Sequence, residues 1–94
     1  MYMSIEPLLG SKTTLRILKI LMQHKELNIS GIARRANINH KVAKERLLLL
    51  IAEGIVREKR FGRIRIFELN FGDERVRALR EILGDKPTAE VSVF

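Results

Sequence analysis

The stretch from residue 28 to residue 47 constrains the fold of this chain more than any other part of its sequence. Ile32 and Ala36 recur at the spacing of one helical face, and Ala43 and Leu47 resume an apolar face farther along. The segment between these two faces is polar and long enough only for a tight turn. The pattern therefore predicts two short helices joined by that turn.

The predicted turn consists of Asn37, Ile38 and Asn39. Asparagine tolerates turn geometry, and we expect the side chain of Ile38 to be buried between the two helices. Asn39 is placed to cap the second helix, and Gly54 to close it in the left-handed conformation. We expect Ser30 to cap the first helix, because its hydroxyl can accept a hydrogen bond from the free N–H groups of the opening turn.

The second helix, about residues 39–53, turns polar and cationic side chains away from its apolar face. These outward residues are His40, Lys41, Lys44 and Glu45. Such groups can meet phosphates or base edges. The arrangement resembles a helix-turn-helix whose second helix enters a DNA major groove. A plain helical hairpin with a solvated charged face explains the same residues equally well, so the rest of the chain decides between the two.

Positive charge is concentrated in the middle of the chain. The 94 residues are enough for one domain, and their formal net charge is +7. Residues 39–65 contain eight Lys or Arg against three acidic residues, whereas residues 66–94 contain four against six. A basic body with an acidic C-terminal segment predicts one face for a polyanion and another face for a different contact.

Residues 55–69 predict a β-hairpin with Gly62 in its turn. Phe67 and Leu69 share the face that we assign to the core, whereas Ile64 and Ile66 point the other way and need a cover. The basic residues of this hairpin are Arg57, Lys59, Arg60, Arg63 and Arg65, with Glu58 among them. A hairpin without a binding role would more often alternate the signs of its charges. The excess therefore indicates a binding surface.

Two further helices complete a predicted domain of residues 1–84. Ser11 is expected to cap the first of them, which buries a leucine-rich face. The cations expected to be solvated on its opposite face are Lys12, Arg16 and Lys19. Asp73 begins the last helix, residues 73–84, and residues 26–29 predict a short strand. Residues 7–10 predict a turn of helix, and residues 85–94 a flexible tail.

The sequence contains more apolar residues than one small core needs. The run from Leu47 to Ile51 is apolar on all sides, and the last helix is too short to be stable alone. We expect the surplus to be divided between the core and a homodimer interface. The residues concerned are Leu48, Ile51, Ile64, Ile66, Val76, Leu79 and Leu83.

The predicted order is helix, short strand, helix, turn, helix, basic hairpin and helix. The motifs that mark it are Leu9-Gly10-Ser11-Lys12 with Leu15-Arg16-Ile17-Leu18 and Leu21, Ile29-Ser30 with Ile32-Ala33, Leu47 and Leu50 with Gly54-Ile55-Val56, and Phe67-Glu68-Leu69-Asn70. In this order and spacing they resemble the winged-helix family, and more narrowly the small regulators of the MarR and ArsR kind that are common in archaea. The resemblance implies an α+β, mostly helical fold: a winged helix-turn-helix with a three-helix core, a hairpin wing and a C-terminal helix.

The resemblance also implies a function, which is sequence-specific binding of double-stranded DNA by a homodimeric transcriptional regulator. The second helix of the motif would lie in the major groove, and the wing on the backbone or in the minor groove. The residues expected to contact DNA are Ser30, Arg34, Arg35, Asn39, His40, Lys41, Lys44, Glu45, Arg57, Lys59, Arg60, Arg63 and Arg65. Arginine in the wing suits a narrow, electronegative minor groove better than lysine does.

Two other functions use the same residues. A non-specific or architectural nucleic-acid-binding protein needs the same charge, and a winged-helix protein-interaction module would use the exposed Ile64 and Ile66. We expect no enzyme, because the sequence lacks a cysteine nucleophile, a glycine-rich phosphate loop and paired carboxylates in an apolar setting. No metal, cofactor or small-molecule effector is expected, and the absence of a membrane span or secretory signal predicts a cytoplasmic protein.

Overall fold

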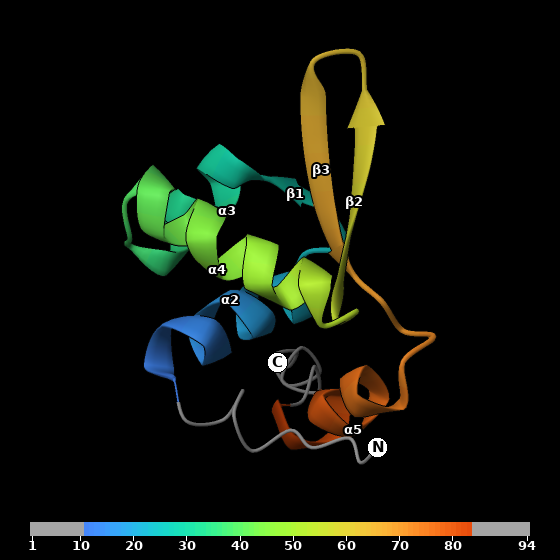
Figure 1. Cartoon of the computed structure of the whole chain (residues 1–94). Helices are drawn as coiled ribbons and strands as arrows, with labels where there is room; N and C mark the ends of the chain where they lie inside the picture. Colours follow the sequence, from blue (N-terminus) through green and yellow to red (C-terminus); the bar gives the residue numbers. More distant parts are fainter. Residues whose placement is uncertain (1–10, 84–94) are drawn as a thin grey trace, which may run out of the picture.

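The structure, a computed structural model, describes residues 11–83. Its elements in chain order are α2 (Lys12–Gln23), β1 (Leu27–Asn28), α3 (Ile29–Ala36), α4 (His40–Ala52), β2 (Val56–Phe61), β3 (Ile64–Leu69) and α5 (Glu74–Leu83). This order of helices and strands is the predicted one, and it confirms the α+β, mostly helical winged fold (Figure 1). The turn of helix predicted at residues 7–10 and the tail predicted at residues 85–94 lie outside the described residues.

The start of α3 corrects one prediction. Ser30 does not cap this helix, because α3 begins before it and Ser30 lies inside the first turn. The cap is Asn28, whose side-chain Oδ1 accepts a hydrogen bond from the Gly31 amide at 2.8 Å. Asparagine and serine are about equally good caps, so residue type alone does not distinguish the two positions.

The turn between α3 and α4 uses two asparagines in different roles. Asn37 is left-handed, with φ 58°, and its amide donates to the Arg34 carbonyl, while the Ile38 amide donates to the Ala33 carbonyl. This pair of bonds closes α3 and satisfies carbonyl groups that the helix leaves without partners. Asn39 then caps α4 through its side-chain oxygen, as predicted. The angle between the two helices is therefore set by backbone bonds within a few residues.

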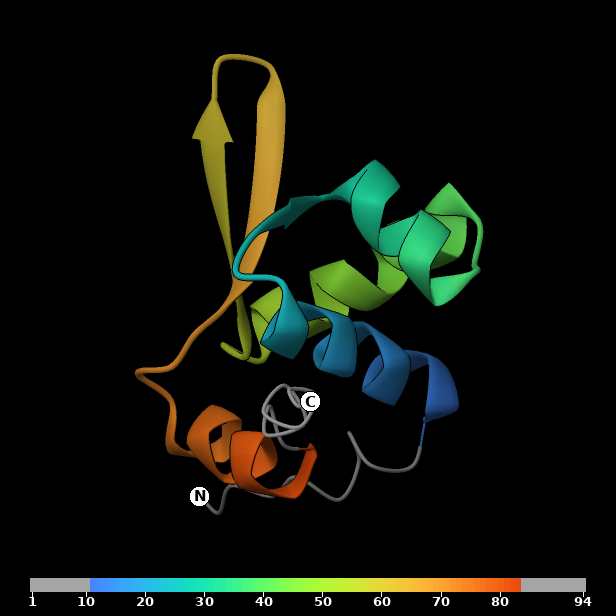
Figure 2. The ribbon, with the colours of Figure 1, turned by 180° about the vertical axis from the view of Figure 1, so that it is seen from behind.

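The three strands form an antiparallel sheet in the order β1-β3-β2. β1 pairs with the middle of β3, where Leu27 lies opposite Phe67 and Asn28 lies opposite Ile66. Toward the hairpin tip β2 and β3 continue without a third strand in the described part of the chain, and they stand clear of the helices in both views (Figures 1 and 2). Gly62 makes the turn at the tip with φ 65°, a conformation that glycine adopts without strain.

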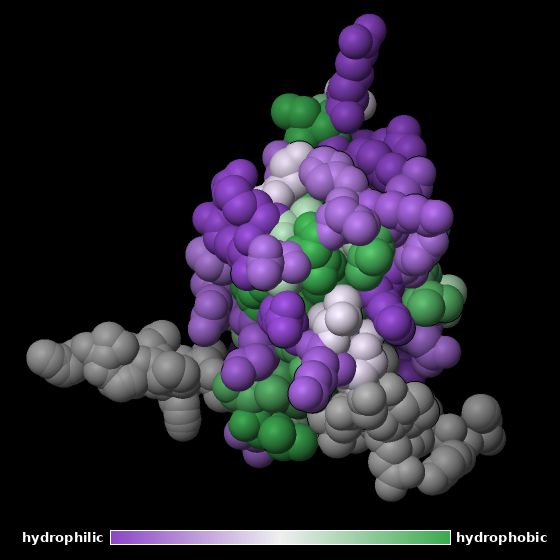
Figure 3. All heavy atoms as spheres, turned by 90° about the vertical axis from the view of Figure 1, so that its left-hand side faces the viewer, coloured by the Kyte–Doolittle hydropathy of each residue, from purple (hydrophilic) through white to green (hydrophobic). Residues whose placement is uncertain are grey.

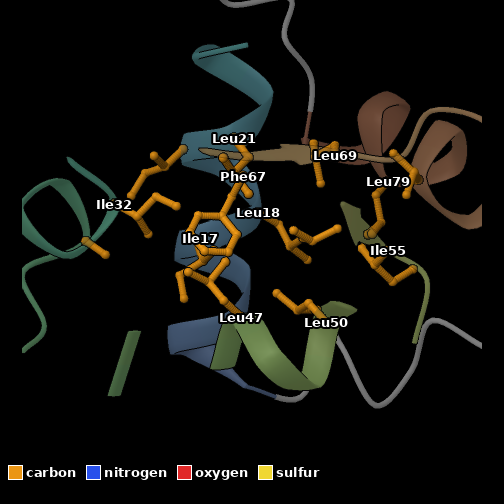
Figure 4. Close-up of a cluster of buried hydrophobic side chains, with 14 residues drawn as sticks. Ile17, Leu18, Leu21, Ile32, Leu47, Leu50, Ile55, Phe67, Leu69 and Leu79 are labelled. Carbon is orange, nitrogen blue, oxygen red and sulfur yellow. The ribbon is translucent and has the colours of Figure 1, made fainter. Parts of the chain in front are cut away.

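Every helix and the base of the hairpin contribute to one hydrophobic core. Phe67 lies among residues of α2, α3 and α4 in the close-up, and Leu69 is buried beside it, as predicted (Figure 4). Ser11 caps α2 as predicted, which fixes the start of the helix that supplies more of this core than any other element. Val76 and Leu79 of α5 have no exposed surface. These two residues therefore belong to the core and not to the predicted dimer interface.

Candidate nucleic-acid interface

The outward face of α4 presents the residues that the sequence assigns to DNA. Lys41, Lys44 and Glu45 are exposed, and neither lysine forms an ion pair within residues 11–83. His40 is also exposed, and its Nε2 lies 3.4 Å from the Ser30 hydroxyl oxygen, so it joins the start of α4 to the start of α3. The two lysines are therefore available to an anion without first losing a carboxylate partner.

The arginines of α3 differ in how they are held. Arg34 is exposed, and Arg35 is exposed with one guanidinium N–H directed at the Gly31 carbonyl of its own helix. A third arginine, Arg16 of α2, donates to the Ala36 carbonyl at the end of α3, at 2.8 Å. The sequence predicted Arg16 as part of a solvated face, and no local pattern indicates a backbone partner so far along the chain. Arg16 supports the turn that orients α4.

One face of the hairpin carries an arginine pair around a carboxylate. Arg65 donates from Nε to Glu58 Oε2 at 2.6 Å and from Nη2 to Oε1 at 3.2 Å. Arg60 approaches the same carboxylate at 3.5 Å. The hydrogen bond from Arg65, and the charges of both arginines, hold the pKa of Glu58 below its ordinary range. These two arginines are thus partly neutralised before any DNA arrives.

The other face of the hairpin carries a second cluster of charges. Glu68 lies 3.3 Å from Arg57 and 3.4 Å from Lys59, and Lys59 also pairs with Glu26, the residue before β1. Charge counting within the hairpin pointed to Glu58 alone as a counter-charge, whereas Glu26 and Glu68 also pair with its cations. Arg63, at the tip, is exposed and forms no ion pair with any residue from 11 to 83.

Side chains of α4 and of the hairpin meet on one side of the molecule. Lys44 and Leu48 of α4 and Arg65 of β3 line one small hollow. A neighbouring groove of about 270 Å³ is lined by residues of β1, the start of α3 and the end of the hairpin, Arg63 and Ile64 among them. The side that carries α3 and the start of α4 is mostly hydrophilic, with apolar atoms visible between the charged side chains (Figure 3). Lys44 of α4 and Arg63 and Arg65 of the hairpin therefore line neighbouring hollows on one side of the molecule.

The remaining residues predicted for a dimer interface lie in different environments. Leu48 and Ile64 are exposed, but each borders the surface just described. Ile51 and Leu83 are half-buried and pack against the core. Ile66 is half-buried in the sheet. The predicted set therefore does not form a single face.

Two observations concern chemistry other than nucleic-acid binding. Within residues 11–83, no three residues among His, Cys, Asp and Glu gather closely enough to hold a metal ion. In the same part of the chain no helix is both long and apolar enough to cross a membrane.

The three-helix core, the turn between α3 and α4 and the projecting hairpin define a winged helix-turn-helix protein. Residues 11–57, half of the chain, match the family described as winged helix-turn-helix DNA-binding. The chain belongs to this family, which is one of DNA-binding proteins and not of enzymes. A comparison with curated proteins found no match.

Several solved structures share the fold at low sequence identity. The antimony-specific transcriptional repressor AntR has a TM-score of 0.73 at 22% identity, over 83% of this chain and 68% of its own. The homodimeric winged helix-turn-helix domain Mb0332 of Mycobacterium bovis, a possible ArsR-family regulator, has 0.69 at 23%, over 96% and 83%. The MarR-family regulator SPO1453 of Silicibacter pomeroyi has 0.67 at 22%, over 90% and 60%. At these identities the likeness confirms the fold.

Proposed function

We propose that this protein is a sequence-specific transcriptional regulator that binds double-stranded DNA in the cytoplasm as a homodimer. One observation carries the proposal: Lys44 of α4 and Arg65 of the hairpin line the same hollow, so the two elements can contact one duplex together. In this arrangement the outward face of α4 lies in the major groove and the hairpin lies on the backbone or in the minor groove. The proposal includes no metal, cofactor or small-molecule effector.

The position of α5 is compatible with a dimer on DNA. This helix lies at the opposite end of the molecule from the hairpin tip, and Ile82 on it is exposed (Figures 1 and 2). A contact between two copies at that end leaves α4 and the hairpin of each copy open to DNA. Two recognition helices related by two-fold symmetry would then meet half-sites about 34 Å apart on one face of the duplex.

Selection of bound sequences from a random duplex library tests the proposal. We expect a palindromic site, because a two-fold symmetric dimer reads the same bases twice. Affinity for that site should exceed affinity for random duplex by about a thousandfold or more. A ratio near one would instead identify a non-specific or architectural binder. No duplex binding even at low salt would contradict the proposal and favour a protein-interaction module.

A further inference from the structure

The hairpin tip carries two large apolar side chains that nothing in the described part of the chain covers. Phe61 ends β2 and Ile64 begins β3, and the two residues lie directly opposite each other in the register. Phe61 is 58% exposed and Ile64 is 54% exposed, even though the two are cross-strand neighbours. The pair stands at the end of the hairpin that projects farthest from the helices (Figures 1 and 2).

Stabilisation of the hairpin alone does not explain this pair. A cross-strand apolar pair contributes about 0.2–1 kcal/mol, and a threonine pair would serve at an exposed site with less apolar surface in water. Apolar groups left in water at the tip of an exposed hairpin also favour association with other molecules. The pair is therefore better explained by a partner that covers it.

The surroundings of the pair identify the chemistry of that partner. Arg60 and Arg63 flank it in the chain, and Ile64 itself lines the groove shared with Arg63, Arg65 and Ser30. An apolar centre with a cationic rim matches a DNA minor groove, whose walls are deoxyribose and whose edges are phosphates. Proteins that bind this groove frequently insert phenylalanine, leucine or isoleucine between base steps.

We propose that Phe61 and Ile64 enter the minor groove as an apolar tip, where they pack on deoxyribose and base edges. The inference rests on the proposed function, which places the hairpin on DNA. A hairpin that enters a groove tip first has a wall on each side, so its two faces contact different strands. Arg60 and Arg65 then face one backbone, while Phe61 and Ile64, on the opposite face of the hairpin, pack against the deoxyribose wall of the other strand, with Arg63 at the tip.

Two substitutions at one position separate an apolar contact from a structural role. Phe61→Thr removes the aromatic ring but keeps a residue that favours strands, whereas Phe61→Leu keeps most of the apolar surface. We expect Phe61→Thr to weaken duplex binding about five- to thirtyfold. The slope of log affinity against log salt should stay unchanged, because no phosphate contact is lost. Phe61→Leu should bind within about threefold of the parent protein.

Phe71 provides a matched control. It is an exposed phenylalanine that follows the base of the same hairpin, 41% exposed, with Arg80 over its ring. Phe71→Thr should leave duplex affinity unchanged. The inference fails if Phe61→Thr binds like the parent protein, if it flattens the salt slope, or if Phe71→Thr weakens binding equally.

Light scattering on the parent protein and on Phe61→Thr completes the test. We expect both to have the same mass in solution. A loss of assembly in Phe61→Thr would identify a second copy of the chain as the cover for the tip and overturn the inference. If the parent protein binds no duplex, the proposed function fails. If the parent protein binds duplex and Phe61→Thr binds it equally well, only the inference about the tip fails.

Discussion

The cations of α4 and those of the hairpin differ in how they are held. Lys41 and Lys44 are exposed and form no ion pair within residues 11–83. In the hairpin, by contrast, the cations that do form ion pairs share three carboxylates, Glu26, Glu58 and Glu68. Arg63 is the hairpin cation that resembles the lysines of α4.

This difference bears on the two tasks of a DNA-binding surface, which are to read base edges and to hold the phosphate backbone. A cation without a partner can turn toward a base edge or phosphate at no cost in lost ion pairs. A cation held by a carboxylate is already fixed in place, but it must share or break that pair to bind a phosphate. We infer that α4 supplies most of the sequence discrimination and that the carboxylates of the hairpin limit non-specific attraction to the backbone.

Lys44→Ala should have the largest effect. If Lys44 reads a base edge, its loss should lower affinity for the selected site about tenfold or more and reduce discrimination against random duplex. Competition between the selected site and random duplex measures both quantities. Lys19→Ala is the matched control, because Lys19 is an exposed lysine on α2 in a hollow shared with Leu83. Equal losses on both DNAs would show that Lys44 contacts only phosphate.

Glu58→Gln should strengthen binding to random duplex. The substitution removes the carboxylate that holds Arg60 and Arg65, so both guanidinium groups become available to phosphates. Affinity should rise about threefold to tenfold at low salt, and the salt slope should steepen by about one to two. Glu81→Gln on α5 makes the same change of formal charge far from the hairpin tip and should do much less. Weaker binding by Glu58→Gln would show that Glu58 instead orients the arginines for DNA.

Arg63→Ala and Arg65→Ala should change the slope of log affinity against log salt by different amounts. Each substitution removes one arginine, from the hairpin turn and from β3 respectively. Arg63 forms no ion pair in the described part of the chain, so its loss should flatten the salt slope by about 0.9. Arg65 is held by Glu58, so its loss should flatten the slope less. Titrations of random duplex at several salt concentrations measure the two slopes. Equal slopes would show that the Arg65–Glu58 pair opens on binding, which would remove the distinction between the two regions.

The sequence predicted the arrangement of elements well because that arrangement depends on local signals. The apolar periodicity, the cap at Asn39 and the glycines at positions 54 and 62 are each readable within a few residues. The cap of α3 was misplaced for the same reason, since Asn28 and Ser30 are both good caps only two positions apart. Local rules identify the elements, but they do not settle competition between adjacent candidates.

The residues of the candidate site could be predicted from the sequence, but the contacts that those residues make with one another and with the rest of the protein could not. The cations of α4 and the hairpin were named from charge and spacing. Their partners were not, because Glu26 reaches Lys59 across the sheet and Arg16 reaches the Ala36 carbonyl from another helix. Such contacts depend on strand register and helix packing, which periodicity does not specify. The division between paired and unpaired cations is consequently a property of the tertiary structure.

The smallest expected effect is a dependence of stability on pH that arises from the hairpin. Arg65 lowers the pKa of Glu58, so the folded state binds a proton at this carboxyl less readily than the unfolded chain does. The stabilisation is complete above the ordinary pKa of glutamate, about 4.3, and is lost as the pH falls through the lowered value. Urea unfolding of the parent protein and of Glu58→Gln should differ by about 0.5–1 kcal/mol at neutral pH, and this difference should shrink below about pH 4. A difference that stays constant down to pH 3 would show that the ion pair contributes nothing, and the hairpin cations would then be as available as those of α4.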